Sequence, residues 1–228
     1  MIFENIRKVV AYVLSNSFAE VLAIFGAMLL GWPAPLLVAQ ILWIHLICDG
    51  PADIMLGFEP KEYGIMDEPP KALKEPILTR LGLSLIGVIS ISSSVAALLL
   101  FGYFLKRDGN EIIGRSYVFA TFAVNSMIYI FAYRSMRRSI FHSGNLMNNK
   151  PLVVAVAGGL LLAFIAFLAP PIRDLLQLAP LALGQWGVIF AIAFFLLVVV
   201  EIGKFISNHR RRPATSAVLG ESFEHKPA

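Results

Sequence analysis

The sequence predicts an all-α membrane protein with six transmembrane helices and both termini in the cytoplasm. Of its 228 residues, 57% are hydrophobic and only 15% are charged, and the mean hydropathy is +0.74. A soluble domain of this size could not bury so much apolar surface, and the single cysteine excludes a disulfide framework. The prediction rests on this composition, on long apolar runs and on an uneven distribution of basic residues.

The apolar runs are each long enough to cross the hydrocarbon core of a bilayer, which takes about 20 helical residues. They lie at residues 9–31, 36–58, 78–105, 115–134, 151–172 and 185–206. Pro33 and Pro35 fall in the short connection between the first two runs, so we expect those two helices to form an antiparallel hairpin. We therefore predict one membrane domain at residues 1–206, followed by a disordered basic cytoplasmic tail at residues 207–228.

Basic residues set the predicted orientation, because cytoplasmic loops of membrane proteins carry an excess of Lys and Arg. With a cytoplasmic N-terminus, all but four of the 19 basic residues flank the runs on the cytoplasmic side. The four on the other side are Lys106, Arg107, Arg115 and Arg173. The net charge of +4 is therefore explained by membrane flanks, and nucleic acid is not a predicted partner.

Two runs carry polar and ionisable residues at mid-membrane depth, where such groups are costly and usually functional. Glu20 lies four residues after Asn16, and Asp49 lies four residues after His45, so each pair shares one face of a helix. Because the two helices form a hairpin, these faces can meet, and converging carboxylates there need protons or a bound cation. Oxygen ligands suit hard cations. The predicted cation site consists of Glu20, Asp49, Ser17, Asn16, His45 and Asp53.

Gly50 and Pro51 directly follow Asp49 and predict an irregular helix at the site. Proline has no N–H to donate to the carbonyl of Ile47, and its ring clashes with that carbonyl. We expect a broken helix that exposes backbone oxygens beside Asp49. Transporters use such breaks to coordinate ions at membrane depth.

Structural roles for some of these residues remain open. Glu20 taken alone also fits a protonated structural hydrogen-bonder, a reading that its pairing with Asp49 disfavours. A lone histidine such as His45 is more often a packed hydrogen-bonder than a ligand. Cys48 is better explained as a small buried hydrophobe than as a thiolate ligand. Asp53 fits an ion-access group and a helix-end charge equally well.

Polar residues in two other runs are expected to have structural roles. Four closely spaced serines of the third run should make helix-packing contacts, as serine commonly does in membranes. They are Ser90, Ser92, Ser93 and Ser94. Near the end of the last run, Glu201 and Lys204 are three residues apart and can pair along the helix.

Three parts of the sequence resemble P2-type cation-transporting ATPases, the calcium-pump group. Their sixth membrane helix and the loop after it resemble three segments of this sequence, Gln40–Pro51, Leu56–Pro60 and Met66–Lys71. The stalk and fifth helix of these pumps resemble residues 3–8 and 12–21. Their loop between helices eight and nine resembles Arg137–Phe141 and Asn149–Pro151. The resemblance covers about residues 2–206 and implies that the six runs are helices five to ten of a ten-helix pump.

The resemblance implies that Glu20 and Asp49 stand at cation-ligand positions and keep the residue type of the family. Four other ligand positions differ, since the calcium pump has Asn, Asn, Thr and Glu where this sequence has Ser17, His45, Cys48 and Ser126. With two of six ligand side chains retained, one divalent ion, together with proton counter-transport, is favoured over two calcium ions. The transported cation is expected to be calcium or another divalent ion such as manganese.

Several sequence motifs of such a pump do not occur in the sequence. They are the Asp-Lys-Thr-Gly-Thr phosphorylation sequence, the Thr-Gly-Glu-Ser actuator loop and the proline motif of the fourth helix. Without a nucleotide-binding domain or a Gly-rich phosphate loop, the chain alone is not expected to hydrolyse ATP. The resemblance implies an amino-terminal half as partner, which would bind ATP and Mg²⁺, and a setting in the lipid of the plasma membrane. A passive cation channel or carrier, and a non-functional pump remnant, remain alternatives.

Overall fold

The computed structural model describes residues 2–60, 77–78, 80–134 and 149–209, and all regular structure in these ranges is helical. The elements are α1 (Ile2–Leu29), α2 (Val38–Leu42), a π-helix η1 (Trp43–Asp49), α3 (Gly50–Gly57), α4 (Arg80–Asp108), α5 (Glu111–Arg134), α6 (Lys150–Leu168), α7 (Pro170–Leu175) and α8 (Leu183–His209). The predicted all-α class is confirmed. The tail from residue 210 onward and the segments Met66–Lys71 and Arg137–Phe141, for which we made predictions, lie outside the described residues.

Five helices of the described part are long and apolar enough to cross a membrane: α1, α4, α5, α6 and α8. The second predicted run is helical from Val38 to Gly57, but it is divided into α2, η1 and α3. Neither α-helical piece reaches spanning length by itself. The count of six spans therefore stays a prediction.

The fifth predicted run, 151–172, is not a single helix, so the prediction of its carboxyl-terminal boundary was wrong. Helix α6 ends at Leu168, and Pro170 begins the short helix α7. Ala169 between them has an extended backbone, with φ −82° and ψ 111°. A residue before proline is disfavoured in the helical region, which explains the boundary.

The first two runs form the expected antiparallel hairpin. Helix α1 is closed by Gly31, whose φ of +70° is accessible to glycine, and the N–H of Trp32 donates to the carbonyl of Ala27 at 2.9 Å. At the other end of the hairpin, Asn5 Nδ2 donates to the carbonyls of Gly57 and Glu59, both at 2.9 Å. The start of α1 therefore lies against the end of α3.

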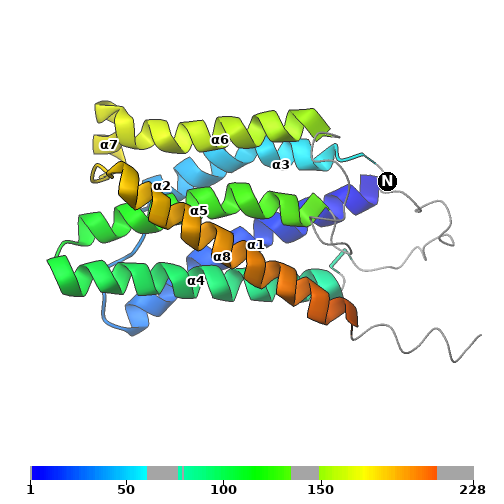
Figure 1. The fold of residues 1–228 in the computed structure, drawn as a ribbon, viewed down its shortest axis with the longest axis horizontal. Helices are drawn as coiled ribbons and strands as arrows, with labels where there is room; N and C mark the ends of the chain where they lie inside the picture. The colour runs from blue at the N-terminus through cyan, green and yellow to red at the C-terminus, as the bar shows by residue number, and fades with distance from the viewer. Residues whose placement is uncertain (1, 61–76, 79, 135–148, 210–228) are drawn as a thin grey trace, which may run out of the picture.

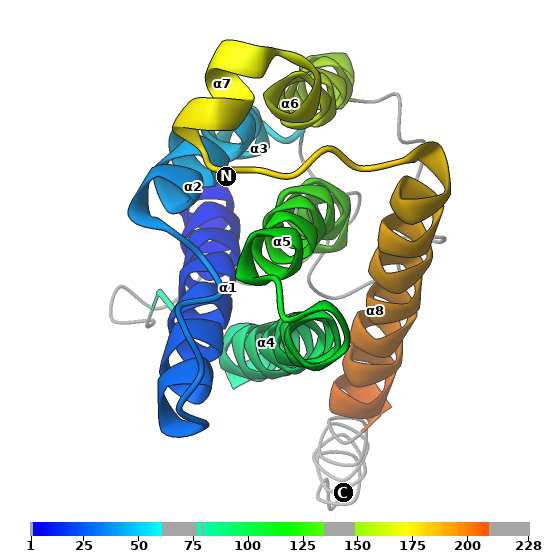
Figure 2. The same ribbon diagram turned by 90° about the vertical axis from the view of Figure 1, so that its left-hand side faces the viewer.

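Helix α5 forms the centre of the bundle. Viewed end-on, it is surrounded by α1, α4, α8, α6 and the α2–α3 segment (Figure 2). In the most apolar part of α5, 89% of the residues are buried, against 28–39% in the other four long helices. The helices run alternately in opposite directions, and the start of α1 and the end of α8 lie at the same end of the bundle (Figure 1). Among the five long helices of the described part, α5 is thus the one shielded by its neighbours on most of its surface.

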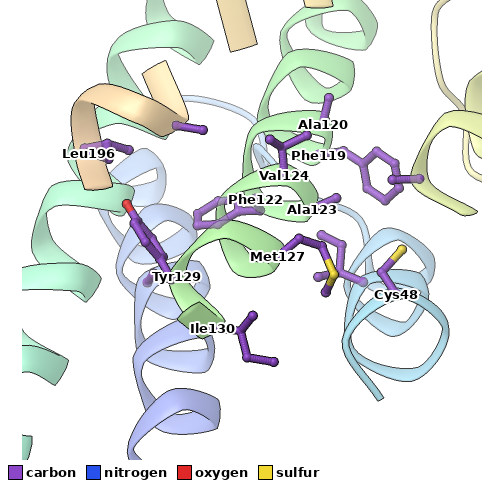
Figure 3. Close-up of a cluster of buried hydrophobic side chains, with 14 of the residues drawn as sticks. Cys48, Phe119, Ala120, Phe122, Ala123, Val124, Met127, Tyr129, Ile130 and Leu196 are labelled. Carbon is purple, nitrogen blue, oxygen red and sulfur yellow. The ribbon is translucent and has the colours of Figure 1, made fainter. Parts of the chain in front are cut away.

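Side chains from α5 form a core that also includes Cys48. Ala123 and Met127 of α5 lie on the side facing the segment that carries Cys48 (Figure 3). Phe119 points toward α6, where its ring lies 5.7 Å from that of Phe167. Cys48 is a free cysteine with no exposed surface. This position agrees with its interpretation as a small buried hydrophobe.

Two of the four serines named above, all on α4, make the predicted contacts with other helices. Ser90 Oγ donates to the Ser15 carbonyl of α1 at 3.0 Å, and Ser93 Oγ donates to the hydroxyl of Tyr129 on α5 at 3.2 Å. Ser92 and Ser94 instead donate to carbonyls of their own helix. The predicted pair on α8 is confirmed, with Lys204 Nζ 3.0 Å from Glu201 Oε1.

Candidate cation site

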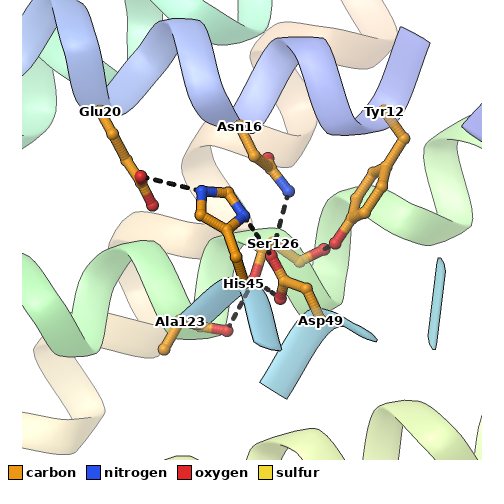
Figure 4. A network of polar contacts seen from close by, with 7 residues as sticks. All are labelled: Tyr12, Asn16, Glu20, His45, Asp49, Ala123 and Ser126. Carbon is orange, nitrogen blue, oxygen red and sulfur yellow. Dashed lines mark hydrogen bonds and ion pairs between the residues drawn. The ribbon is translucent and has the colours of Figure 1, made fainter. Parts of the chain in front are cut away.

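Asp49 lies at the centre of a buried polar network that joins three helices (Figure 4). Its side chain comes from the last turn of η1, and the residue is 1% exposed. Oδ1 accepts a hydrogen bond from Ser126 Oγ of α5 at 2.7 Å, and Oδ2 accepts a longer one from Asn16 Nδ2 of α1 at 3.5 Å. A buried carboxylate requires such donors, because desolvation without them is very costly.

The imidazole of His45 lies between the two predicted carboxylate ligands. Its Nε2 is 2.9 Å from Glu20 Oε2, and its Nδ1 is 3.9 Å from Asp49 Oδ2. Glu20 is 4% exposed, whereas the side chain of His45 keeps 30% of its surface accessible. The faces of α1 and η1 therefore meet as the spacing of four residues predicted, and His45 bridges them.

Ser126 belongs to the network although it was not among the predicted site residues. Besides its bond to Asp49, its hydroxyl oxygen lies 3.1 Å from the Ala123 carbonyl. Its own carbonyl accepts a hydrogen bond from the Tyr12 hydroxyl at 3.0 Å. The signal that could have found Ser126 was the resemblance described above, which implies that Ser126 stands where the calcium pump has a ligand glutamate.

The remaining predicted residues lie outside this network. Ser17 is half-buried on α1, next to Asn16, and Asp53 is half-buried on α3, one turn beyond Asp49. In the described ranges, no group of three or more His, Cys, Asp and Glu side chains has the arrangement of a metal site. The candidate ligands around Asp49 therefore include amide and hydroxyl groups together with two carboxylates.

The irregularity expected at Gly50 and Pro51 takes the form of a π-helix, and the prediction that the helix is broken there was wrong. The chain stays helical from Val38 to Gly57, and the wider turns of η1 occupy the seven residues before Gly50. A π-helical turn has hydrogen bonds from residue i to residue i+5 and so holds one more residue than an α-helical turn. The wider turns before Pro51 let the chain stay helical although Pro51 has no N–H to donate.

Gly159 of α6 lets the neighbouring helix approach this widened segment. A Cβ atom at Gly159 would lie 2.7 Å from the carbonyl oxygen of Cys48 and 2.6 Å from the sulfur of Met127. Both distances are too short for ordinary packing. The glycine is thus required where α6 contacts the backbone next to Asp49.

A second buried polar cluster, which the sequence did not suggest, joins α1, α3, α5 and α6 at the end of the bundle. Glu59 accepts hydrogen bonds from Arg134 Nε and from Asn149 Nδ2, each at 2.7 Å. Lys8 Nζ donates to the Arg134 carbonyl at 2.6 Å. Glu59 and Arg134 are only 5% and 6% exposed. Arg134 is the last residue of α5 and Glu59 follows the end of α3, so nothing in their sequence positions indicates that they meet.

The fold and this site define a helical integral membrane domain with a carboxylate-centred network inside the bundle. A family model described as "Cation transporting ATPase, C-terminus" matches residues 33–206. The chain therefore belongs to this family, the carboxyl-terminal membrane domain of P-type pumps of the calcium-pump group.

Three relatives are similar over most of the chain. "Calcium-transporting ATPase 1" of Bacillus cereus is 30% identical over 91% of this chain and 25% of its own length. "Probable cation-transporting ATPase F" of Mycobacterium tuberculosis is 29% identical over 93% of this chain and 23% of its own length. "Calcium-transporting ATPase type 2C member 1" of Mus musculus is 31% identical over 95% of this chain and 23% of its own length. The chain thus spans about a quarter of the length of these relatives.

Proposed function

We propose that the chain is the part of a P-type pump that holds a divalent cation inside the membrane, with Glu20 and Asp49 as the charged ligands. The observation that carries the proposal is the pair of buried carboxylates, supplied by two antiparallel helices and bridged by His45. Two anions facing each other in a low-dielectric interior need a compensating positive charge. A divalent cation between them supplies it.

Asn16, Ser17, His45 and Asp53 are the other groups of the proposed site. Asn16 donates to Asp49 in the structure, and its carbonyl oxygen is a suitable ligand for a hard cation. Glu20 can bind a cation fully only after its contact with His45 is released, so His45 moves when the cation arrives. Carboxylate and amide oxygens suit calcium and manganese. The names of two of the relatives, calcium-transporting ATPases, also support calcium.

The energy for transport is proposed to come from an amino-terminal half that binds ATP and Mg²⁺. The sequence contains no Asp-Lys-Thr-Gly-Thr phosphorylation sequence, and this chain alone should not hydrolyse ATP. Its relatives are about four times as long, which supports the proposal that this chain works together with a further part of a pump. The setting is the lipid of the plasma membrane, with residues 1–206 as the membrane domain and 207–228 as a basic cytoplasmic tail.

The cation site is tested in the pump formed with the amino-terminal half. Cation-dependent phosphorylation from ATP is measured over calcium and manganese concentrations. Glu20→Gln and Asp49→Asn should each abolish it, because an amide keeps the size but removes the charge that compensates a divalent ion. His45→Asn should be milder and favour harder ions. Glu111→Gln, at the exposed start of α5, is the matched control and should behave as the parent does. If both carboxylate variants keep the cation affinity of the parent, the site lies elsewhere.

Six spans and cytoplasmic termini are proposed from the basic residues that flank the runs. The common position of the start of α1 and the end of α8 at one end of the bundle supports an even number of crossings (Figure 1). A cysteine introduced at Gly109, between α4 and α5, should react with an impermeant reagent added outside intact cells. A cysteine introduced at Ser216 should react only after the cells are opened. Equal labelling of both from outside would contradict the proposed orientation.

A further inference from the structure

A cavity of about 270 Å³ lies between α1 and α3, close to the candidate site. Its lining consists of Ile6, Val9, Val10, Asp53, Ile54 and Gly57. Asp53 is the one ionisable residue of this lining, and the other five are apolar or lack a side chain. The cavity therefore has a single charged feature within an apolar wall.

One carboxylate oxygen of Asp53 is buried without a hydrogen-bond partner among the described residues. Oδ1 has almost no accessible surface, and no donor from the part of the chain that the structure describes reaches it. An unsatisfied buried carboxylate oxygen is costly, and such groups in folded proteins are usually explained by water or an ion. A water molecule takes up about 30 Å³ in the liquid, so the cavity has room for several.

The α3 residues that line the cavity, Asp53, Ile54 and Gly57, lie between Asp49 and the end of α3. The outermost lining residues of the cavity are Ile6, in the second turn of α1, and Gly57, the last residue of α3, whose carbonyl is bonded by Asn5. Asp53 lies four residues after Asp49, which on a helix is a rise of about 6 Å. A cation at Asp53 is therefore one helical turn from the centre of the polar network.

We propose that this cavity is a hydrated vestibule through which a divalent cation reaches Asp49, with Asp53 as the carboxylate that attracts it. The proposal deepens the proposed function and rests on it. Ile54, at the cavity, is 60% exposed, so the cavity opens on the outer surface of the α1–α3 hairpin. A carboxylate that faced lipid at this place would be costly, whereas one that faces water attracts cations and raises their local concentration.

The vestibule is tested by the reaction rates of single cysteines, with the chain in lipid nanodiscs and Cys48→Ala as background. Ile54→Cys reports on the cavity. Leu83→Cys is the matched control, because Leu83 is 53% exposed and lies three residues from the start of α4, as Ile54 lies three residues from the end of α3. The two reagents are the cationic methanethiosulfonate ethyltrimethylammonium and the anionic methanethiosulfonate ethylsulfonate.

Ile54→Cys should react with the cationic reagent about tenfold faster than Leu83→Cys does, after correction for the intrinsic rates of the reagents. It should also prefer the cationic to the anionic reagent, and adding Asp53→Asn should remove most of this preference. Reaction of Ile54→Cys no faster than Leu83→Cys would show that the cavity is not hydrated. A preference that survives Asp53→Asn would show that Asp53 does not attract the cation, and either result overturns the proposal.

Failure of the vestibule and failure of the cation site are distinguishable. The labelling rates require no bound cation and no amino-terminal half, whereas the loss of phosphorylation in Asp49→Asn requires both. If Ile54→Cys fails to react while Asp49→Asn still abolishes phosphorylation, only the vestibule is wrong. If the labelling pattern is as expected while Asp49→Asn keeps the cation affinity of the parent, the hydrated cavity does not serve a site at Asp49, and the access role is overturned.

Discussion

Replacing Arg134 with methionine should lower the free energy of unfolding by about 3–5 kcal/mol, the usual cost of removing one partner of a buried ion pair. Arg134 Nε lies 2.7 Å from Glu59 Oε1, and both side chains are less than 10% exposed. Methionine keeps the length of the stem but leaves the Glu59 carboxylate buried without its cation. The measurement is reversible unfolding of the purified chain in mixed micelles at increasing dodecyl sulfate fraction.

Arg173→Met is the matched control for this change. Arg173 pairs with Asp174 at 3.8 Å, and the side chain of Asp174 is 77% exposed. An exposed ion pair of this kind contributes about 0–1 kcal/mol, so the control should unfold nearly as the parent does. Adding Glu59→Gln to Arg134→Met should recover part of the lost stability, because the uncompensated charge is then gone. Equal unfolding of Arg134→Met and Arg173→Met would contradict a buried pair.

The cluster around Glu59 bears on the cation site because it fixes the end of α3. Glu59 contacts Arg134 of α5 and Asn149 at the start of α6, and Asn5 of α1 holds the carbonyl of Glu59. Asp49 lies just before α3 and meets Ser126 of α5. The relative positions of α1, α3 and α5 are thus held near one end by this cluster and at mid-height by the Asp49 network.

The hairpin part of the site was predictable from the sequence. The spacing of four residues places His45 and Asp49 on one face, and the short connection at Pro33 brings that face against Glu20. Helix periodicity and a tight turn together fix which residues of neighbouring helices meet. The contact of His45 with Glu20 at 2.9 Å agrees with this reasoning.

The contribution of α5 was not predictable in the same way. Ser126 is 77 positions from Asp49, and periodicity gives no register between helices that are distant in sequence. The burial of Glu59 with Arg134 depends on the same long-range packing, since each residue alone appears as a charge at the end of an apolar run. Pro51 indicates a lost hydrogen bond, but whether the chain unwinds or widens into a π-helix depends on what packs beside it.

Gly159→Ala should destabilise the chain by about 1–3 kcal/mol, the usual cost of inserting a methyl group into a packed interior. The new Cβ would lie 2.7 Å from the carbonyl of Cys48. That carbonyl belongs to the backbone of η1, so it cannot move aside without displacing Asp49. We therefore also expect weaker cation-dependent phosphorylation in the assembled pump. Gly158→Ala is the control on the same helix, because its Cβ would have no neighbour within 4 Å, and alanine favours the helix over glycine by up to about 1 kcal/mol. Unfolding in mixed micelles should separate the two variants, and if they unfold alike, α6 does not pack against the carbonyl of Cys48.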